Sequence, residues 1–233
     1  MADEREVASR AETHDAQSIE AQKRAAAEAA ALLVQDGMRV GLGTGTTAAY
    51  LFPALASRAL NDIRCVASSP ATEQAARALG LPLATLEQVG GELEIAIDGA
   101  DQIDRRGWLV KGRGGAHARE KILAAAASRF VVIASHEKAV ATLGPPIPLE
   151  LMRFGAAYTL RALSPSRVRG GSLSPDGNVI ADYLGPVEDA AQLAARISAT
   201  PGTVAHGLFP PALVSDILLA GPAGVEHRTV AHD

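Results

Sequence analysis

The sequence predicts an α/β protein in which a parallel β-sheet has helices on both faces. Three observations support this prediction. Between residues 38 and 134, short apolar runs alternate with Ala-rich helical stretches, as in repeated β-α-β units. Turns rich in glycine, threonine or aspartate follow several of these runs, where strands pass into helices. Aromatic residues make up only 3% of the chain, so Ala, Leu, Val and Ile must fill the core.

The first helix is predicted over residues 18–35, which are rich in alanine, contain neither Gly nor Pro, and precede Gly37. Lys23 lies on the apolar face of this helix. Its side chain could take part in a functional site, or it could extend past the small alanines and place its charge in water. A second helix begins at Ala48, and Pro53 is expected to kink or restart it. The remaining elements of this part are strands over residues 38–42, 63–67, 93–97, 108–111 and 130–134, and helices over 71–79 and 116–128.

A proline-rich run over residues 143–148 breaks this alternation and predicts a domain boundary. The apolar run at residues 216–220 is a last strand that could rejoin the first sheet. We therefore expect one domain over residues 16–145 and 212–233, a second over 146–211, and a disordered tail over 1–15. Within the second domain the expected order is strand (147–151), helix (155–163), strand (167–172), strand (178–184), helix (187–199) and strand (202–208), which is the ferredoxin-like βαββαβ arrangement.

Charge and cysteine content narrow the class of protein. The 22 Lys and Arg residues against 26 Asp and Glu give a net charge of −4, which provides no general field for nucleic acid or an anionic membrane. The N-terminus is polar, and no apolar stretch approaches the roughly 20 residues that span a bilayer. The single Cys65 lies in an apolar run and excludes an internal disulfide. We expect a cytoplasmic protein whose partner is a small molecule.

The loop after the first strand, GLGTGTTAA at residues 41–49, could bind an anion through backbone N–H groups and threonine hydroxyls. The dinucleotide fingerprint fails because Thr46 takes the third glycine position, and the P-loop pattern lacks Gly-Lys-Ser/Thr. The loop could still bind a phosphate or a carboxylate in another way. Turns rich in glycine and threonine also occur as ordinary connections between a strand and a helix.

Two further loops carry charged residues at predicted strand ends. Asp98 and Asp101 directly follow an apolar strand, where they could act in a site or cap a turn. Lys111 precedes a glycine-rich turn and a helix bearing Glu120, which could equally lie on a solvated face. His117, Glu120 and Asp98 could also hold a metal, but a lone His on a helix is usually a surface residue.

Taken together, GLGTGTTA, AIDGADQID and KGRGGAHAREKI resemble, in order and spacing, the signature stretches of type A ribose-5-phosphate isomerases. The similarity extends from about Lys23 to Gly221. It implies a Rossmann-like domain with an inserted smaller ferredoxin-like domain, and a homo-oligomer, either dimer or tetramer. It also implies interconversion of D-ribose 5-phosphate and D-ribulose 5-phosphate through an enediolate, in the non-oxidative pentose phosphate pathway, without metal or organic cofactor.

The resemblance assigns a role to each matching residue. Glu120 matches the general acid/base, and Lys111 matches the cation beside the developing oxyanion. Asp98 and Asp101 match carboxylates that line the sugar and assist ring opening. The residues that match the substrate and phosphate grip are Lys23, Gly43, Thr44, Gly45, Thr46, Thr47, Gly112, Gly114 and Lys138.

The sequence also departs from the family pattern. Arg113 stands where Gly is usual, and Ser135 and Glu137 stand where Asp and Ser are usual. In the second domain, Ser174-Pro175-Asp176 replaces the usual Thr-Asp-Asn. These departures affect the phosphate side of the site and one turn of the second domain, and leave the four residues matched to catalysis unchanged.

Two alternatives remain. A sugar-phosphate sensor of a transcriptional regulator would need a DNA-binding segment, and the chain before the first strand is too short for one. A related isomerase/deaminase or an acyl-CoA transferase would share the topology without this pair of charged loops. Turnover of ribose 5-phosphate separates these possibilities.

Overall fold

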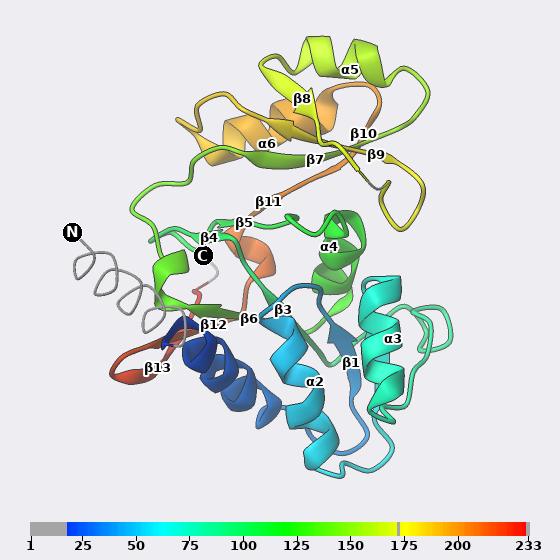
Figure 1. Ribbon diagram of the computed structural model, residues 1–233, viewed down its shortest axis with the longest axis vertical. Helices are drawn as coiled ribbons and strands as arrows, with labels where there is room; N and C mark the ends of the chain where they lie inside the picture. Colours follow the sequence, from blue (N-terminus) through cyan, green and yellow to red (C-terminus); the bar gives the residue numbers. More distant parts are fainter. Residues whose placement is uncertain (1–17, 172, 232–233) are drawn as a thin grey trace, which may run out of the picture.

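The computed structural model describes residues 18–171 and 173–231. The expected tail over residues 1–15 lies outside the described residues. Figure 1 shows a larger α/β part that carries a smaller part, built on a second sheet, at one end. Among the described helices, none is both long and apolar enough to cross a bilayer.

The larger part is built on a six-stranded sheet in the order β13-β12-β6-β3-β1-β2. Its strands are β1 (Arg39–Leu42), β2 (Arg64–Ala67), β3 (Ile95–Gly99), β6 (Phe130–Ser135), β12 (Asp216–Gly221) and β13 (Gly224–Thr229). The strands from β2 to β12 pair in parallel, and only β13 is antiparallel to its neighbour. The predicted late strand therefore does rejoin the first sheet. β13 was not predicted, because its residues are all exposed and show no apolar alternation.

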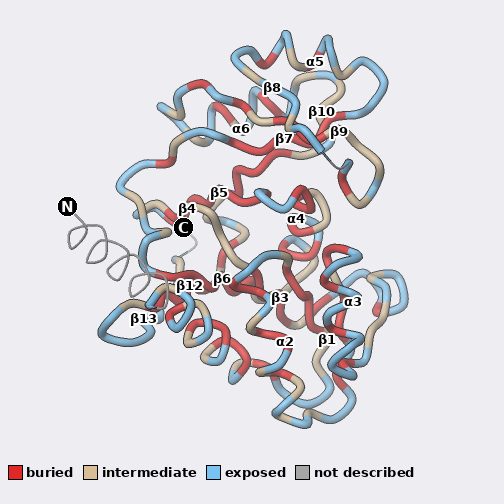
Figure 2. The backbone as a smooth tube through the Cα atoms, in the orientation of Figure 1, coloured by how far each residue is buried: buried red, intermediate tan, exposed pale blue. Residues whose placement is uncertain are grey.

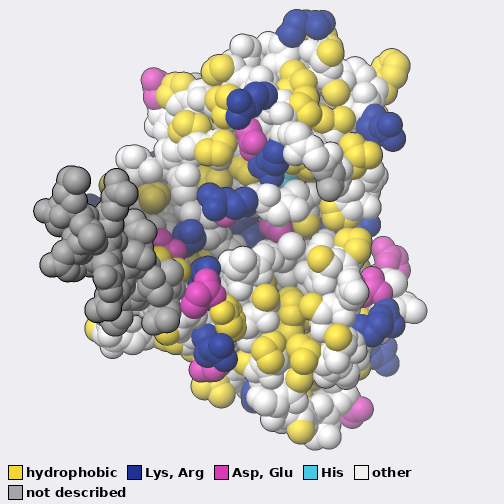
Figure 3. Space-filling model, viewed as in Figure 1, with side chains coloured by type: hydrophobic (Ala, Val, Ile, Leu, Met, Phe, Trp, Pro, Cys, Tyr) yellow, Lys and Arg dark blue, Asp and Glu magenta, His cyan; other side chains and the backbone are white. Residues whose placement is uncertain are grey.

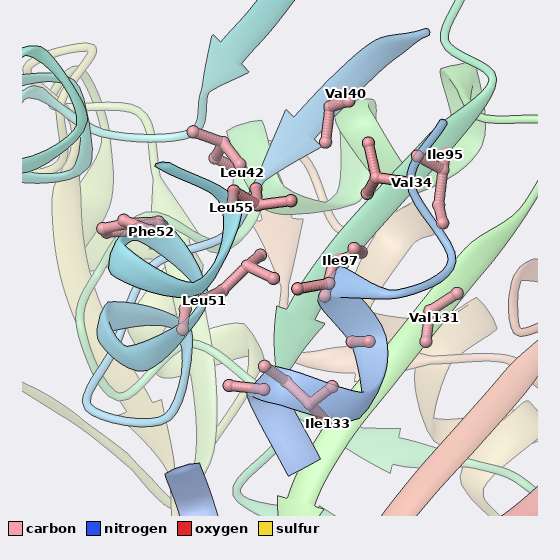
Figure 4. Close-up of a cluster of buried hydrophobic side chains, with 14 of the residues drawn as sticks. Val34, Val40, Leu42, Leu51, Phe52, Leu55, Ile95, Ile97, Val131 and Ile133 are labelled. Carbon is pink, nitrogen blue, oxygen red and sulfur yellow. The ribbon is translucent and has the colours of Figure 1, made fainter. Parts of the chain in front are cut away.

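Helices cover both faces of this sheet, as predicted. They are the helix over residues 18–31, α2 (Ala48–Ser57), α3 (Pro70–Ala78) and α4 (His117–Ala126). On one face, Leu51, Phe52 and Leu55 of α2 pack against strand residues such as Ile97, as Figure 4 shows. On the other face, α4 contributes Leu123 to a second cluster. Figure 2 shows that the buried stretches follow the strands.

Two helices differ from expectation. The first helix ends at residue 31 instead of 35. The N–H groups of Leu33 and Val34 donate to the carbonyls of Ala30 and Ala31, three residues earlier, and not to carbonyls four residues earlier as in an α-helix. Pro53 lies inside α2 without interrupting it. A proline costs the helix one hydrogen bond, and the apolar face that α2 buries around Pro53 offsets that loss.

The smaller part is a four-stranded antiparallel sheet in the order β10-β7-β9-β8, with two helices. This is the ferredoxin-like order that the sequence predicts, so the fold class is confirmed. The positions of the two domain boundaries stay a prediction. The elements are β7 (Ile147–Leu151), α5 (Ala156–Ala162), β8 (Ser166–Val168), β9 (Val179–Tyr183), α6 (Ala190–Ala199) and β10 (Thr203–His206).

A third, three-stranded sheet was not predicted and lies between the two larger ones. It pairs β4 (Gln102–Ile103), β5 (Leu109–Val110) and β11 (Leu208–Phe209) as antiparallel neighbours. The strand expected over 108–111 belongs here instead of in the parallel sheet. The strand expected over 202–208 divides at Gly207, whose carbonyl accepts from the Lys111 N–H and whose N–H donates to the Pro148 carbonyl. Two short 3-10 helices complete the chain, η1 (His136–Lys138) and η2 (Pro211–Leu213).

Candidate active site

A cavity of about 440 Å³ opens at the carboxyl ends of β1 and β3, where open α/β sheets bind their ligands. Figure 3 shows Lys and Arg side chains gathered around the hollow between the two parts of the molecule. Four basic side chains and two carboxylates line this cavity, so its charge suits an anion. The lining residues are Lys23, Thr44, Gly45, Thr46, Thr47, Ala48, Gly99, Ala100, Asp101, Lys111, Gly112, Arg113, Gly114, Glu120 and Lys138.

The structure brings together the residues that the sequence singles out. The residues that the resemblance assigns to the site all line the cavity except Asp98 and Gly43, which are not among its lining residues. Asp98 is only 3% exposed. Its Oδ1 accepts hydrogen bonds from the N–H groups of Thr44 (3.1 Å) and Gly99 (2.7 Å). Asp98 thereby ties the loop after β1 to the end of β3.

Gly43 is required by this contact. A Cβ atom at that position would overlap the carboxylate carbon and Oδ1 of Asp98. The glycine therefore allows the loop after β1 to approach a buried carboxylate at van der Waals distance. Its role in this structure is to shape the loop, so a direct contact with substrate is not needed to explain it.

Lys111 lies between two buried carboxylates. Its Nζ is 2.8 Å from Oδ2 of Asp98 and 3.2 Å from Oε2 of Glu120, and it also donates to the Gly99 carbonyl. Lys111 is 2% exposed and Glu120 is 4% exposed. Burial opposes the charge on Lys111, but Asp98 and Glu120 outweigh it and raise the Lys111 pKa to about 12. Lys111 therefore stays protonated across the physiological range.

Glu120 titrates much closer to neutrality. Burial raises the pKa of its carboxyl to about 8; the positive charge of Lys111 opposes this rise and the negative charge of Asp98 adds to it. Burial also raises the pKa of Asp98, against the opposing charge of Lys111 and the hydrogen bonds it accepts. A carboxyl whose pKa is about 8 can both take and return a proton near neutral pH, which is the property that a general acid/base needs.

The other end of the cavity is formed by the amino end of α2. Among the described residues, the N–H groups of Gly45, Thr46 and Thr47 have no protein acceptor. Lys23 lines the cavity beside them and pairs with Glu20 at 2.6 Å, and Lys138 pairs with Glu137 at 3.5 Å. Free N–H groups at a helix N-terminus with two cations nearby make a suitable site for a phosphate.

Thr44 differs from the threonines that follow it, because its polar groups already have protein partners. Its N–H donates to Asp98, and its Oγ1 is 2.7 Å from Ser68 Oγ, 2.9 Å from Ser69 Oγ and 3.0 Å from Thr72 Oγ1. Thr72 Oγ1 in turn donates to the Gly43 carbonyl. This buried hydroxyl cluster holds the loop, and sequence reasoning missed it. Its only signal was Ser69, a serine at the N-cap of α3.

Asp101 and Arg113 lie at the mouth of the cavity. Asp101 Oδ2 accepts from the Arg113 N–H at 3.2 Å, while the Arg113 Nε is 3.8 Å from Asp101 Oδ1. The Arg113 side chain is 83% exposed. It replaces the usual glycine without filling the cavity.

His117 is fully buried, contrary to its interpretation as an ordinary surface residue. A Cβ atom on Gly112 would collide with its ring, so the His117 ring packs directly beneath the glycine-rich turn. Burial, with Lys121 and Arg169 nearby, lowers the His117 pKa to about 3. Within residues 18–171 and 173–231, no three His, Cys, Asp or Glu side chains lie together as a metal site, so His117, Glu120 and Asp98 do not form the alternative centre.

Comparison with known proteins identifies one family. Its model, described as ribose 5-phosphate isomerase A (phosphoriboisomerase A), matches residues 64–224. A protein of Chloroflexus aurantiacus named ribose-5-phosphate isomerase A is 43% identical, over 92% of this chain and 95% of its own. The protein of that name from Caulobacter vibrioides is 45% identical, over 82% of this chain and 91% of its own.

Solved structures give the same result. Ribose 5-phosphate isomerase A of Methanocaldococcus jannaschii superposes with a TM-score of 0.85 at 33% identity, covering 90% of this chain and 99% of its own. A D-ribose-5-phosphate isomerase in complex with phospho-erythronic acid has a TM-score of 0.86 at 28% identity, covering 91% of this chain and 99% of its own.

Proposed function

The chain belongs to the ribose 5-phosphate isomerase A family, and we propose that the cavity around Lys111 is where it interconverts D-ribose 5-phosphate and D-ribulose 5-phosphate. The observation that carries this assignment is the buried lysine held between Asp98 and Glu120 at one end of a cavity whose other end suits a phosphate. A sugar phosphate needs both ends at once.

Glu120 moves the proton in this proposal. Its ionised carboxylate takes the proton from C2 of the open-chain aldose, and the C–H electrons form a C1=C2 double bond while charge moves to O1. The protonated Glu120 then returns the proton to C1, a proton passes from O2 to O1, and C2 becomes the ketone carbon. One carboxylate can serve both steps because C1 and C2 are adjacent.

Lys111 stabilises the oxyanion of the enediolate. Because it is buried and fixed by two carboxylates and a carbonyl, its ammonium group needs no reorganisation when charge develops on O1 or O2. We assign Asp98 to holding Lys111 and the loop after β1, and Asp101 to the sugar hydroxyls at the cavity mouth. Gly112 and Gly114 line the cavity without side chains, so the sugar can lie against their backbone.

A coupled assay tests this function directly. Purified protein given ribose 5-phosphate should form ribulose 5-phosphate at the same rate with and without EDTA, since the proposed chemistry uses only protein side chains. Absence of turnover in both conditions would favour the sugar-phosphate sensor. Turnover that EDTA abolishes would require a metal.

Lys23→Ala should raise KM for ribose 5-phosphate by about tenfold or more and change kcat little. A hydrogen bond to a charged group contributes ~1.5–3 kcal/mol, and the phosphate is held alike in the ground and transition states. Arg24→Ala is the matched control, because Arg24 is the neighbouring cation and does not line the cavity. An unchanged KM in Lys23→Ala would remove this residue from the phosphate site.

The pH dependence of kcat/KM should show the Glu120 pKa. This carboxyl must be ionised to take the C2 proton, and its pKa is raised to about 8, so activity rises as the pH passes through that value. The sugar phosphate is already a dianion above pH ~7, since its second pKa is about 6, and Lys111 stays charged. We expect kcat/KM to rise roughly tenfold between pH 7 and a plateau above pH ~9. A flat profile from pH 7 to 9 would contradict this assignment.

We place the enzyme in the cytoplasm, because its single cysteine suits a reducing compartment.

We also propose a homo-oligomer, a dimer or a tetramer as the family pattern implies. Phe154, which is 89% exposed, and the half-exposed Met152 and Tyr158 offer apolar surface for such contacts. Sedimentation equilibrium measures the assembly directly, and a monomer at micromolar concentration would contradict it.

A further inference from the structure

The glycine-rich turn that follows Lys111 has few bonds of its own. Gly112 and Gly115 adopt left-handed backbone conformations, with φ of +107° and +74°, and one bond, from the Gly115 N–H to the Gly112 carbonyl, closes the turn. Such a turn can take several conformations unless neighbouring groups fix it. Residues 112–114 nevertheless form a wall of the substrate cavity.

Arg169 of the smaller part reaches this turn. Its Nη1 donates to the carbonyl of Gly112 at 3.1 Å and to the carbonyl of Arg113 at 2.7 Å. The rest of the guanidinium faces Asp182 on β9, with Nε 3.1 Å from Oδ2 and Nη2 bonded to Oδ1. The bidentate pair fixes the orientation of the guanidinium plane, so Nη1 is directed at the turn.

These contacts hold both peptide units between Gly112 and Gly114. In the first, the Gly112 carbonyl accepts from Arg169 and the Arg113 N–H donates to Asp101. In the second, the Arg113 carbonyl accepts from Arg169. The C=O and N–H of a trans peptide point in opposite directions, so the Gly114 N–H points away from Arg169. That N–H has no acceptor within the described residues.

We propose that Arg169, oriented by Asp182, is a positioning residue for the isomerisation. From its position directly after β8, it fixes the turn so that the Gly114 N–H is directed at a sugar hydroxyl beside Lys111. Arg169 is not among the residues that line the cavity, so it acts through the turn and not on the substrate. This inference rests on the proposed function. In this proposal the smaller part contributes to the reaction, because its β8–β9 segment sets the geometry of a loop in the larger part.

Arg169→Lys tests the proposal conservatively. A lysine keeps the positive charge, but it lacks the planar fork needed to reach Asp182 and two carbonyls together. We expect kcat/KM for ribose 5-phosphate to fall by about 10-fold to 100-fold, the range that follows from a displacement of about 1 Å near the reacting atoms. Affinity for 4-phosphoerythronate, measured by calorimetry, should weaken in parallel. Asp182→Asn should give a smaller loss of the same kind, and the double variant should resemble Arg169→Lys, because the two residues act as one unit.

Arg129→Lys is the matched control. It disrupts an Arg–Asp pair of similar length, to Asp216 at 2.6 Å, at the amino end of β6 and away from the cavity. If Arg169→Lys lowers Tm as Arg129→Lys does but leaves kcat, KM and 4-phosphoerythronate affinity within twofold of wild type, Arg169 is only structural and the proposal is wrong. If Arg169→Lys does not fold, Asp182→Asn decides by the same readouts. Wild-type protein without isomerase activity would overturn the proposed function instead.

Discussion

Glu120→Gln is expected to lower kcat at least ~100-fold while the protein still folds and binds ribose 5-phosphate. Glutamine keeps the shape of the side chain and its hydrogen-bonding capacity but has no basic lone pair to take the C2 proton. A lost general base costs ~10²–10⁴ in rate. Lys111 keeps its second carboxylate, Asp98, at 2.8 Å, so its charge remains compensated. Steady-state kinetics and calorimetric titration with ribose 5-phosphate provide the two readouts.

Exchange of the C2 hydrogen with deuterated water distinguishes Glu120 from the neighbouring carboxylates. Wild-type protein should exchange this hydrogen during turnover, and Glu120→Gln should not. Asp98→Asn should slow turnover and leave some exchange detectable, because it disturbs Lys111 and the loop after β1 without removing the base. Near-normal exchange in Glu120→Gln would show that another residue takes the proton.

Lys111→Met should lower kcat by ~10²–10³-fold, the effect of removing one preorganised donor from an oxyanion site. It should also cost about 3–5 kcal/mol of unfolding free energy, because two buried carboxylates lose their shared cation. Urea unfolding measures the second quantity, and kinetics are measured well below the Tm of the variant so that only folded enzyme is compared.

Lys121→Met is the control for this substitution. Lys121 is a partly buried lysine of this region, and the Nζ atoms of both lysines lie over the Phe209 ring, at 5.5 Å for Lys111 and 4.8 Å for Lys121. Lys121 donates to the carbonyls of His206 and Leu208, does not line the cavity, and has its pKa lowered to about 8 by burial. We expect Lys121→Met to lower stability and to leave kcat within about tenfold. Equal losses of kcat in the two variants would mean that Lys111 acts only through packing.

The sequence was informative wherever a pattern is local. Apolar runs between Gly-rich turns identified the parallel strands, and the order of elements from Ile147 onward identified the second sheet. The two aspartates, which the sequence shows as a pair, have different environments in the structure. Asp98 is buried beneath the loop after β1, and Asp101 lies at the mouth of the cavity. Periodicity does not report that difference, because Asp98 is near the end of β3 and Asp101 follows only two residues after that strand ends.

The features that the sequence did not reveal depend on contacts between distant segments. The strands of the three-stranded sheet have two residues each, too few to show any alternation. Thr44 meets Ser69 across 25 positions, and Arg169 meets Gly112 across 57. Single serines, threonines and arginines occur throughout a sequence, so only the folded chain shows which of them hold the site.

In the proposed mechanism, one cavity holds the phosphate at the amino end of α2 and the reacting carbons beside Lys111 and Glu120. A crystal structure with 4-phosphoerythronate, whose carboxylate mimics the enediolate oxygens, tests it most directly. We expect the phosphate to lie against the N–H groups of Gly45 to Thr47, within reach of Lys23 and Lys138, and the carboxylate to lie beside Lys111. This mechanism would be contradicted by a reversed orientation, or by binding only in the separate cavity of about 680 Å³ that Arg77 and Arg119 line.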